Sequence, residues 1–428
     1  MKRLVTLLPL LLAAPLAEAG ILTVGPSGTF PDIQPAIDAA MPGDVLLIEP
    51  GLYSEFVLNK SLRLYGQPGA TVQGLSTAAA PVTVTGIAAD EHAMIAGLSI
   101  GPSAVSCLFA SCPSAEIVGN AGTIVLQELD AVGVRLDQNA LVVMTATRSE
   151  GFGSAGPGYG VSVATTELWL VGCELEGGGA SSTFYDTTAS GPGLIAEDAA
   201  VYVAESTVRG GDGGTIVGSC FGGPTFVGLS GSPGIEAGGG SFVKVVSGPG
   251  QTITGGSGGF TSSGCPGAGA PGVRLTGTAQ LLAVDSIAIA GGLDYGSAVP
   301  KPPVEVNDAA ASVQTALTYP LLSAPTSTSP GATVALNASG NPGASLVLFA
   351  ALSPSSLLLI PGVDGATLLD PSQAVAFGAV PLSVMGSASF PLALPAVPTL
   401  VGLLAVFQGV ELGGPQTALT NPAFVTIL

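Results

Sequence analysis

Short apolar runs alternate with turn residues along most of the chain, and the pattern repeats. Segments that start at Gly133, Gly160 and Gly193 each hold a glycine, a branched apolar residue and then three short runs of alternating apolar and polar residues. Looser copies start at Gly234 and Gly272. One copy cannot bury its apolar side chains alone, whereas stacked copies can, each strand pairing in parallel with its counterpart one rung away. The repeat therefore predicts an all-β parallel β-helix.

Overlaying the copies predicts which side chains point inward and which point outward. If Leu168 and Leu170 point inward, Trp169 points outward, because side chains alternate along a strand. Tyr202 occupies the same outward position one rung on. One inward position of the overlay is occupied by Leu141, Leu168 and Val201, and a later position by the small residues Ala146, Cys173 and Ser206. Val142 and Val243 fall at the outward position of Trp169 in their own copies. The neighbouring outward position is occupied by Met144, Val171 and Ala204.

The residues in excess of one coil fall at one corner of the predicted helix. They form Gly/Ser-rich loops at about 177–192, 210–233 and 248–271. Insertions confined to one corner are typical of solenoids, and such loops often carry the binding function.

The sequence patterns at the two ends of the predicted β-helix differ. A short helix around Ile33–Ala40, with Asp32 as its N-cap and Pro42-Gly43 after it, predicts a cap for the first rung. At the other end, Lys301-Pro302-Pro303 begins a stiff segment, and a linker at 306–318 leads into short apolar runs separated by Pro and Gly. Turn signals at this spacing predict a small β-sandwich over 319–428, so the β-helix covers 20–305.

The first nineteen residues have the layout of a secretory signal peptide. Lys2 and Arg3 precede an apolar stretch, and Ala17-Glu18-Ala19 supplies the small residues that flank a cleavage site. Cleavage near Ala19 predicts a secreted or cell-surface protein; the alternative is an N-terminal membrane anchor. No later run is long enough to predict a membrane span.

The stretch from Gly25 to Glu55 resembles the opening of pectinesterase-like and periplasmic-copper-protein-like members of the pectin lyase-like superfamily. The residues that carry the resemblance are GPSGTFPDIQPAIDAAMPGD and, after three further residues, IEPGLYSE. The resemblance implies a right-handed parallel β-helix and, often, action on acidic polysaccharides. The Asp motifs with a later Arg or Lys that the enzymes need have no counterpart here. The end of the chain, with Leu419-Thr420-Asn421, resembles a C-terminal module of exported bacterial proteins.

The charge and the cysteine content of the chain limit the kinds of partner, metal site and disulfide that can be expected. The formal net charge is −19, so Lys/Arg patches for nucleic acid or anionic membranes are not expected. With one histidine and no CxxC spacing we expect no metal site and no cofactor; acidity is compatible with Ca²⁺, but no motif indicates it. Among the five cysteines, Cys107 with Cys112 and Cys220 with Cys265 are the candidate disulfides, and Cys173 reads as a buried thiol.

Two outward columns are candidate sites. Trp169 above Tyr202 predicts an aromatic platform for a sugar ring; the favoured alternative is that a loop or the C-terminal domain covers the rings. Glu176 and Arg209, with Glu174 beside them, fit an ion-pair ladder. They are also the catalytic candidates, since uronide chemistry needs a carboxylate and a cation.

These patterns favour an exported, non-catalytic β-helix with a structural or glycan-binding role at the cell surface. Its expected partner is a polysaccharide or cell-envelope glycan. The alternative is a polysaccharide lyase, hydrolase or esterase of the pectin lyase-like type. The sequence gives no indication of the oligomeric state.

Overall fold

The computed structural model describes residues 20–427 apart from a set of short segments. The segments outside the description are 75–79, 103–114, 152–157, 181, 184–185, 188–189, 215–229, 247–250, 260–266, 285–287, 317–319, 353, 360–362, 364–365, 370–372, 398–399, 401–402 and 416. The predicted signal peptide and the candidate disulfide cysteines Cys107, Cys112, Cys220 and Cys265 therefore lie outside the described residues.

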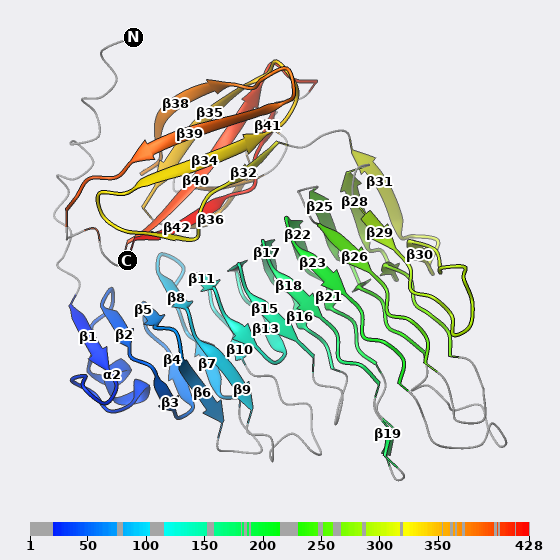
Figure 1. Ribbon diagram of the computed structural model, residues 1–428, viewed down its shortest axis with the longest axis horizontal. Helices are drawn as coiled ribbons and strands as arrows, with labels where there is room; N and C mark the ends of the chain where they lie inside the picture. The colour runs from blue at the N-terminus through cyan, green and yellow to red at the C-terminus, as the bar shows by residue number, and fades with distance from the viewer. Residues whose placement is uncertain are drawn as a thin grey trace.

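Three long parallel sheets form a right-handed parallel β-helix, as predicted (Figure 1). Each full rung passes from the β4–β30 sheet to the eleven-strand sheet and then to the β3–β29 sheet. The eleven-strand sheet contains β1 (Ile21–Val24), β2 (Val45–Ile48), β5 (Arg63–Gly66), β8 (His92–Ala96), β11 (Thr123–Gln127), β14 (Leu141–Thr145), β17 (Glu167–Val171), β22 (Ala200–Ala204), β25 (Phe242–Val246), β28 (Gln280–Val284) and β31 (Ser312–Ala316).

The other two sheets have shorter strands. The β4–β30 sheet contains β4 (Phe56–Leu58), β7 (Val82–Thr85), β10 (Ala115–Val118), β13 (Val134–Asp137), β16 (Val161–Ala164), β21 (Leu194–Glu197), β24 (Ile235–Gly238), β27 (Val273–Leu275) and β30 (Val304–Val306). The β3–β29 sheet contains β3 (Gly51–Tyr53), β6 (Ala70–Gly74), β9 (Ser99–Pro102), β12 (Asp130–Ala131), β15 (Arg148–Glu150), β18 (Glu174–Glu176), β23 (Thr207–Arg209), β26 (Thr252–Thr254) and β29 (Ala288–Ala290).

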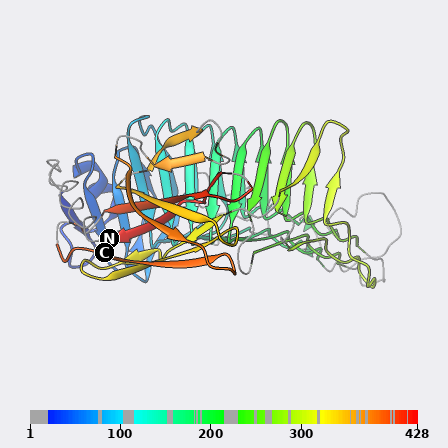
Figure 2. The same cartoon turned by 90° about the horizontal axis from the view of Figure 1, so that it is seen from above.

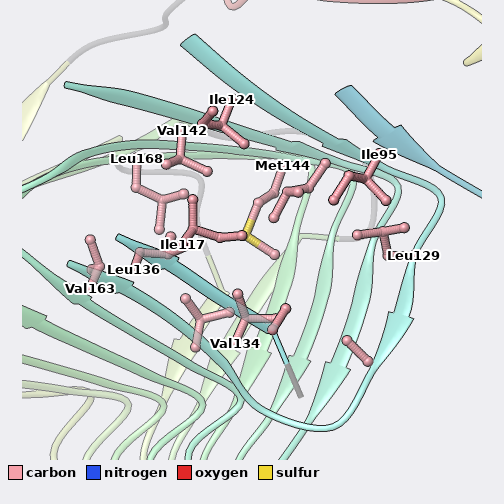
Figure 3. Close-up of a cluster of buried hydrophobic side chains, with 14 of the residues drawn as sticks. Ile95, Ile117, Ile124, Leu129, Val134, Leu136, Val142, Met144, Val163 and Leu168 are labelled. Atoms are coloured by element: carbon pink, nitrogen blue, oxygen red, sulfur yellow. The ribbon is translucent and has the colours of Figure 1, made fainter. Parts of the chain in front are cut away.

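Inward side chains of the three sheets form one continuous apolar core. Figure 3 shows part of it, with Ile124, Val142 and Leu168 in a column that faces Leu136 and Val163 from another sheet. Removing such side chains from water supplies most of the favourable free energy of folding.

The predicted overlay is wrong by one residue in the rung that starts at Gly133. Val142 pairs with Leu168 and Met144 pairs with Leu170, so both side chains lie in the core, and Val143 pairs with Trp169. The turn before β14 is one residue longer than its counterpart before β17, and a shift of one residue exchanges the two faces of a strand. Buried Asn139 lies in this longer turn and accepts a 2.8 Å hydrogen bond from Asn120 Nδ2.

The same shift affects the second corner and the rung after Tyr202. Ala146 has a φ of 45° and turns the corner, as Gly172 does with a φ of 62°. Lys244, not Val243, pairs with Tyr202. The overlay of Leu168 with Val201, and of Cys173 with Ser206, agrees with the observed pairing.

The N-terminal cap has the predicted form. Helix α2 spans Ile33–Ala39, and Ile33 N donates to the Asp32 carboxylate at 2.8 Å. Ile33 and Ile37 are buried against the first rungs. Lys60 Nζ donates to the carbonyl oxygens of Ile37, Asp38 and Ala40 at 2.8, 2.9 and 3.1 Å, which satisfies the end of the helix.

The stretch 306–318, expected as a linker, contains the last strand of the β-helix. β31 (Ser312–Ala316) pairs in parallel with β28, and β30 ends at Val306. The preceding Pro302-Pro303 and the low charge after Asp308 indicated a linker, but the alternation of Val313 with polar neighbours is what adds a strand to the stack.

Two sheets, mainly antiparallel, pack around a second core after residue 320. One contains β32 (Leu321–Ser323), β34 (Thr333–Ser339) and β39 (Ser387–Ala393); the other contains β33 (Ser327–Thr328), β42 (Ala423–Ile427), β40 (Leu404–Leu412), β35 (Ser345–Ala351) and β38 (Val375–Pro381), with β41 (Ala418–Leu419) beside β40. β36 (Pro354–Leu359) pairs with β37 (Ala366–Leu369), and β19 (Ser182–Thr183) pairs with β20 (Asp186–Thr187).

Candidate functional site

The predicted aromatic column lies on the outer face of the eleven-strand sheet. Trp169 on β17 stacks on Tyr202 on β22, with ring centroids 4.2 Å apart and an interplanar angle of 11°. Leu168 and Leu170, on either side of Trp169, point into the core, as the alternation predicted. Trp169 is only 5% exposed, so something covers the outward face of its ring.

The C-terminal domain covers this face. Trp169 belongs to a buried cluster that also contains Leu404, Val406 and Phe424 of that domain. Along β40, Leu404 and Val406 alternate with Ala405 and Phe407, which point into the core of the sandwich. Figures 1 and 2 show the domain lying over the eleven-strand sheet. A ligand reaches the ring faces only if the domain moves away.

Polar contacts fix the docked position. Gln127 Nε2 on β11 donates to the carbonyl oxygen of Thr326 at 2.6 Å, and Gln127 Oε1 accepts from Thr426 Oγ1 at 2.9 Å. Thr326 Oγ1 also donates to the Glu128 carboxylate. Buried polar groups that are satisfied on both sides specify one arrangement of two surfaces.

A partly buried carboxyl lies beside the aromatic pair, and the sequence analysis did not single it out. Glu167, two residues before Trp169 on the same face of β17, accepts a 2.7 Å hydrogen bond from Trp169 Nε1. Burial raises the pKa of Glu167 to about 7, although the hydrogen bond from Trp169 opposes the rise. The signal was the i, i+2 spacing of Glu and Trp on one strand face.

The charged candidates lie on the β3–β29 sheet and are joined by ion pairs. Arg209 Nη1 contacts Glu176 Oε1 at 3.0 Å, as the ladder predicted, and Arg209 also contacts Asp212. Arg148 contacts Glu150 at 3.3 Å and Glu174 at 3.9 Å. These side chains are a third to a half or more exposed, so each pair contributes about 0–1 kcal/mol. The structure brings the predicted catalytic candidates together on an open, exposed sheet.

The corner loops form an unexpected hydrogen-bonded layer. We call the segments 177–180, 190–193, 210–214, 230–234, 255–259, 267–271 and 291–293 the glycine layer. Outgoing and returning segments alternate: Gly191 N donates to Gly178 O, Gly211 N to Gly191 O and Gly256 N to Ser232 O, at 2.8–2.9 Å. Outgoing segments also bond to one another, from Ala180 N to Asp212 O at 2.8 Å and from Gly213 N to Ser257 O at 2.7 Å.

Glycine is required in this layer because the backbones are in close contact. A Cβ on Gly211 would lie closer than 3.0 Å to Gly178 O, and one on Gly256 would clash in the same way with Gly211 O. The loops are therefore a second ordered layer along the corner of the β-helix, built from backbone.

Among the described residues, the one cysteine is buried and the histidine is partly buried. Cys173 is a free thiol, and burial raises its pKa to about 11. His92, whose Nε2 lies 3.5 Å from Arg63 Nη2, has its pKa lowered to about 4 by burial and, to a smaller extent, by the Arg63 charge.

Over the described residues, no group of three or more His, Cys, Asp or Glu side chains is placed to hold a metal ion. No helix in the described part of the chain has the length and hydropathy to cross a membrane.

Comparison with protein-family models, curated proteins and solved structures gave no match. What the fold and these sites define is a class: an all-β protein with a right-handed parallel β-helix, a covered aromatic face, an exposed ion-pair ladder and a glycine layer.

Proposed function

We propose that the protein is exported and acts as a non-catalytic structural element at the cell surface, in contact with envelope glycan. We further infer that it is a divergent member of the pectin lyase-like superfamily, on the N-terminal resemblance and the β-helix together. The glycine layer is the observation that carries the structural role.

The layer supports a structural role because its backbone hydrogen bonds make the β-helix rigid. Its segments bond laterally in two directions, so bending one rung against the next would break several backbone hydrogen bonds at once. Gly179 and Ala268 of the layer are exposed and Ser257 is half-buried, and these small and polar residues leave the layer open to a flat, hydroxyl-rich surface.

The charged ladder supports the absence of turnover. Each guanidinium of Arg148 and Arg209 contacts two carboxylates, an arrangement that neutralises charge along the sheet and, at Asp212, in the adjoining glycine layer. Under this proposal the Trp169–Tyr202 pair serves to dock the C-terminal domain, and ligand binding at the pair requires undocking.

The test uses the secreted full-length protein on pectin, alginate and neutral insoluble glycans, and on purified cell envelopes. We expect retention on the envelope fraction and no release of reducing or unsaturated ends. Surface labelling of intact producing cells should detect the protein. A cytoplasmic location, or no retention on any glycan or envelope, would contradict the proposal.

Matched variants separate the enzymatic alternative. Turnover that is lost in Glu176→Gln and Arg209→Ala but kept in Arg135→Ala would establish the alternative. Arg135 is the control because it is an arginine of similar exposure, paired with Glu116 at 3.1 Å on another sheet.

A further inference from the structure

The last rung of the β-helix exposes its inward face. Val313 on β31 continues the column of Val243 and Leu281, which are at most 1% exposed, yet Val313 is 43% exposed. Val306 on β30 pairs with fully buried Leu275 and is 46% exposed. Val304 of the same rung and Ile289 on β29, the last strand of its sheet, are only partly buried. Exposure rises at this rung because none of the described elements continues the three sheets beyond β29, β30 and β31.

Further exposed apolar side chains gather at this end. Leu293, Tyr295 and Val299 lie in the turn that closes the glycine layer, and Val299 is 71% exposed. Solvent-exposed apolar clusters of this kind beside unpaired strand edges mark interaction surfaces. Figures 1 and 2 show the C-terminal domain over the other rungs, away from β31.

The opposite end of the β-helix is closed. Helix α2 covers the first rungs with Ile33 and Ile37, and Gln34 Oε1 accepts from the edge amide of Val57 at 2.7 Å. A head-to-tail stack of two copies would therefore place the open rung against a helix whose apolar face is already buried. The C-terminal end of a second copy, in contrast, has the same exposed apolar rung and can cover the first.

Charge at the open end is compatible with such a contact. Arg274 pairs with Glu305 at 3.0 Å and Lys301 pairs with Asp294 at 3.2 Å. Asp308 accepts a hydrogen bond from the Gly277 amide. Two of the ten basic residues of a chain with net charge −19 thus lie at this end, which makes it closer to neutral than the chain as a whole.

We propose that two copies of this chain associate through their open C-terminal rungs as a two-fold symmetric dimer. The last strands of each sheet meet across the axis, and the inward apolar residues of the two rungs cover one another. A two-fold contact uses the same surface on both copies, so assembly stops at two.

The experiment is light scattering on the full-length mature protein over a range of concentrations. We expect a dimer, and we expect Val313→Glu or Val299→Asp to raise its dissociation constant about a hundredfold or more, because each places an unpaired charge in the contact. Val57→Glu is the control, since Val57 has the same 43% exposure on β4 at the closed end.

Hydrogen exchange of the unsubstituted protein gives a second measurement that does not depend on variants folding. Amides of β31 should exchange more slowly at high concentration than at low concentration, whereas those of β4 should not change. A protein that stays monomeric, or one that grows into filaments, would overturn the proposal. So would a dimer that survives both end substitutions.

Discussion

Trp169 is the only tryptophan of the chain, and its indole nitrogen donates to Glu167 beneath the C-terminal domain. The carboxyl is held in surroundings that disfavour its charge, so its pKa is raised to about 7. In the unfolded chain the same carboxyl ionises near its ordinary value of 4.5. Folding therefore becomes less favourable as the pH rises between these two values.

We expect Glu167→Gln to stabilise the protein at pH 8 and to lose that advantage near pH 4. The glutamine keeps an oxygen for Trp169 Nε1 but carries no charge. The pH-dependent part of the gain is on the order of 3 kcal/mol, because the pKa of Glu167 is raised from 4.5 to about 7. Denaturant unfolding followed by Trp169 fluorescence measures it.

The contribution of His92 cancels when the free energy of unfolding of the parent protein is subtracted from that of the variant. Its pKa is lowered to about 4, so the protein also loses stability as the pH falls below 6.5, equally in both proteins. Exposed Glu150→Gln serves as the control and should show no such pH-dependent gain. A Glu167→Gln advantage that is the same at pH 4 and pH 8 would contradict the raised pKa.

Whether a side chain points into the core or outward could be predicted where the turns before the strands have equal lengths. The prediction was wrong where the turn lengths differ. Trp169 and Tyr202 were placed on the outer face because β17 and β22 are reached by turns of equal length. Met144 was misplaced because the turn with Asn139 adds one residue. The covering of Trp169, to which Glu167 is hydrogen-bonded, could not be read from the local pattern, because it depends on side chains more than two hundred residues later, such as Val406.

At the scale of elements, the corner loops show what a repeat can and cannot predict. Their position at one corner follows from the excess length of each copy, and the structure has them there. Their ordered packing does not follow, because a Gly/Ser-rich stretch reads as a flexible linker unless its lateral partners are known. Those partners, such as Gly178 for Gly191, lie in other loops.

Gly256→Ala should destabilise the β-helix by about 1–3 kcal/mol. The added Cβ would meet the backbone of Gly210 and Gly211, which cannot give way as a flexible side chain would. Gly101→Ala is the matched control on β9, since nothing lies within 4 Å of a Cβ there. Thermal unfolding at one scan rate compares the two, and an equal midpoint for both variants would show that the glycine layer is loosely packed.

At the scale of the whole molecule, two domains and the cap at Asp32 follow from the sequence, because each rests on local patterns. The linker prediction failed because β31 is a single short strand whose partner, β28, comes from the rung before. The docking of the domains was partly foreseen. Apolar residues on the outward face beside Trp169 indicated a cover by a loop or by the C-terminal domain, and the structure has the domain there, with β40 apolar on both faces.

Undocking of the C-terminal domain should therefore be visible at Trp169. We expect Val406→Asp to shift Trp169 emission to longer wavelength and to raise its quenching by acrylamide several-fold. Val406 is fully buried on the face of β40 that meets the β-helix, and an unpaired carboxylate there opposes docking. Circular dichroism should show that strand content is retained.

Two further variants identify the cause of any such change. Val384→Asp alters an 89% exposed side chain of the same domain and should leave the emission unchanged. Gln127→Ala acts from the β-helix side, where it removes the bonds to Thr326 O and Thr426 Oγ1, and should shift the emission in the same direction by a smaller amount. If Val406→Asp and Gln127→Ala both fold and leave Trp169 shielded, the C-terminal domain is not what covers the aromatic pair. If both expose it, the contact between the two domains controls access to the one aromatic face that the described rungs offer a ligand.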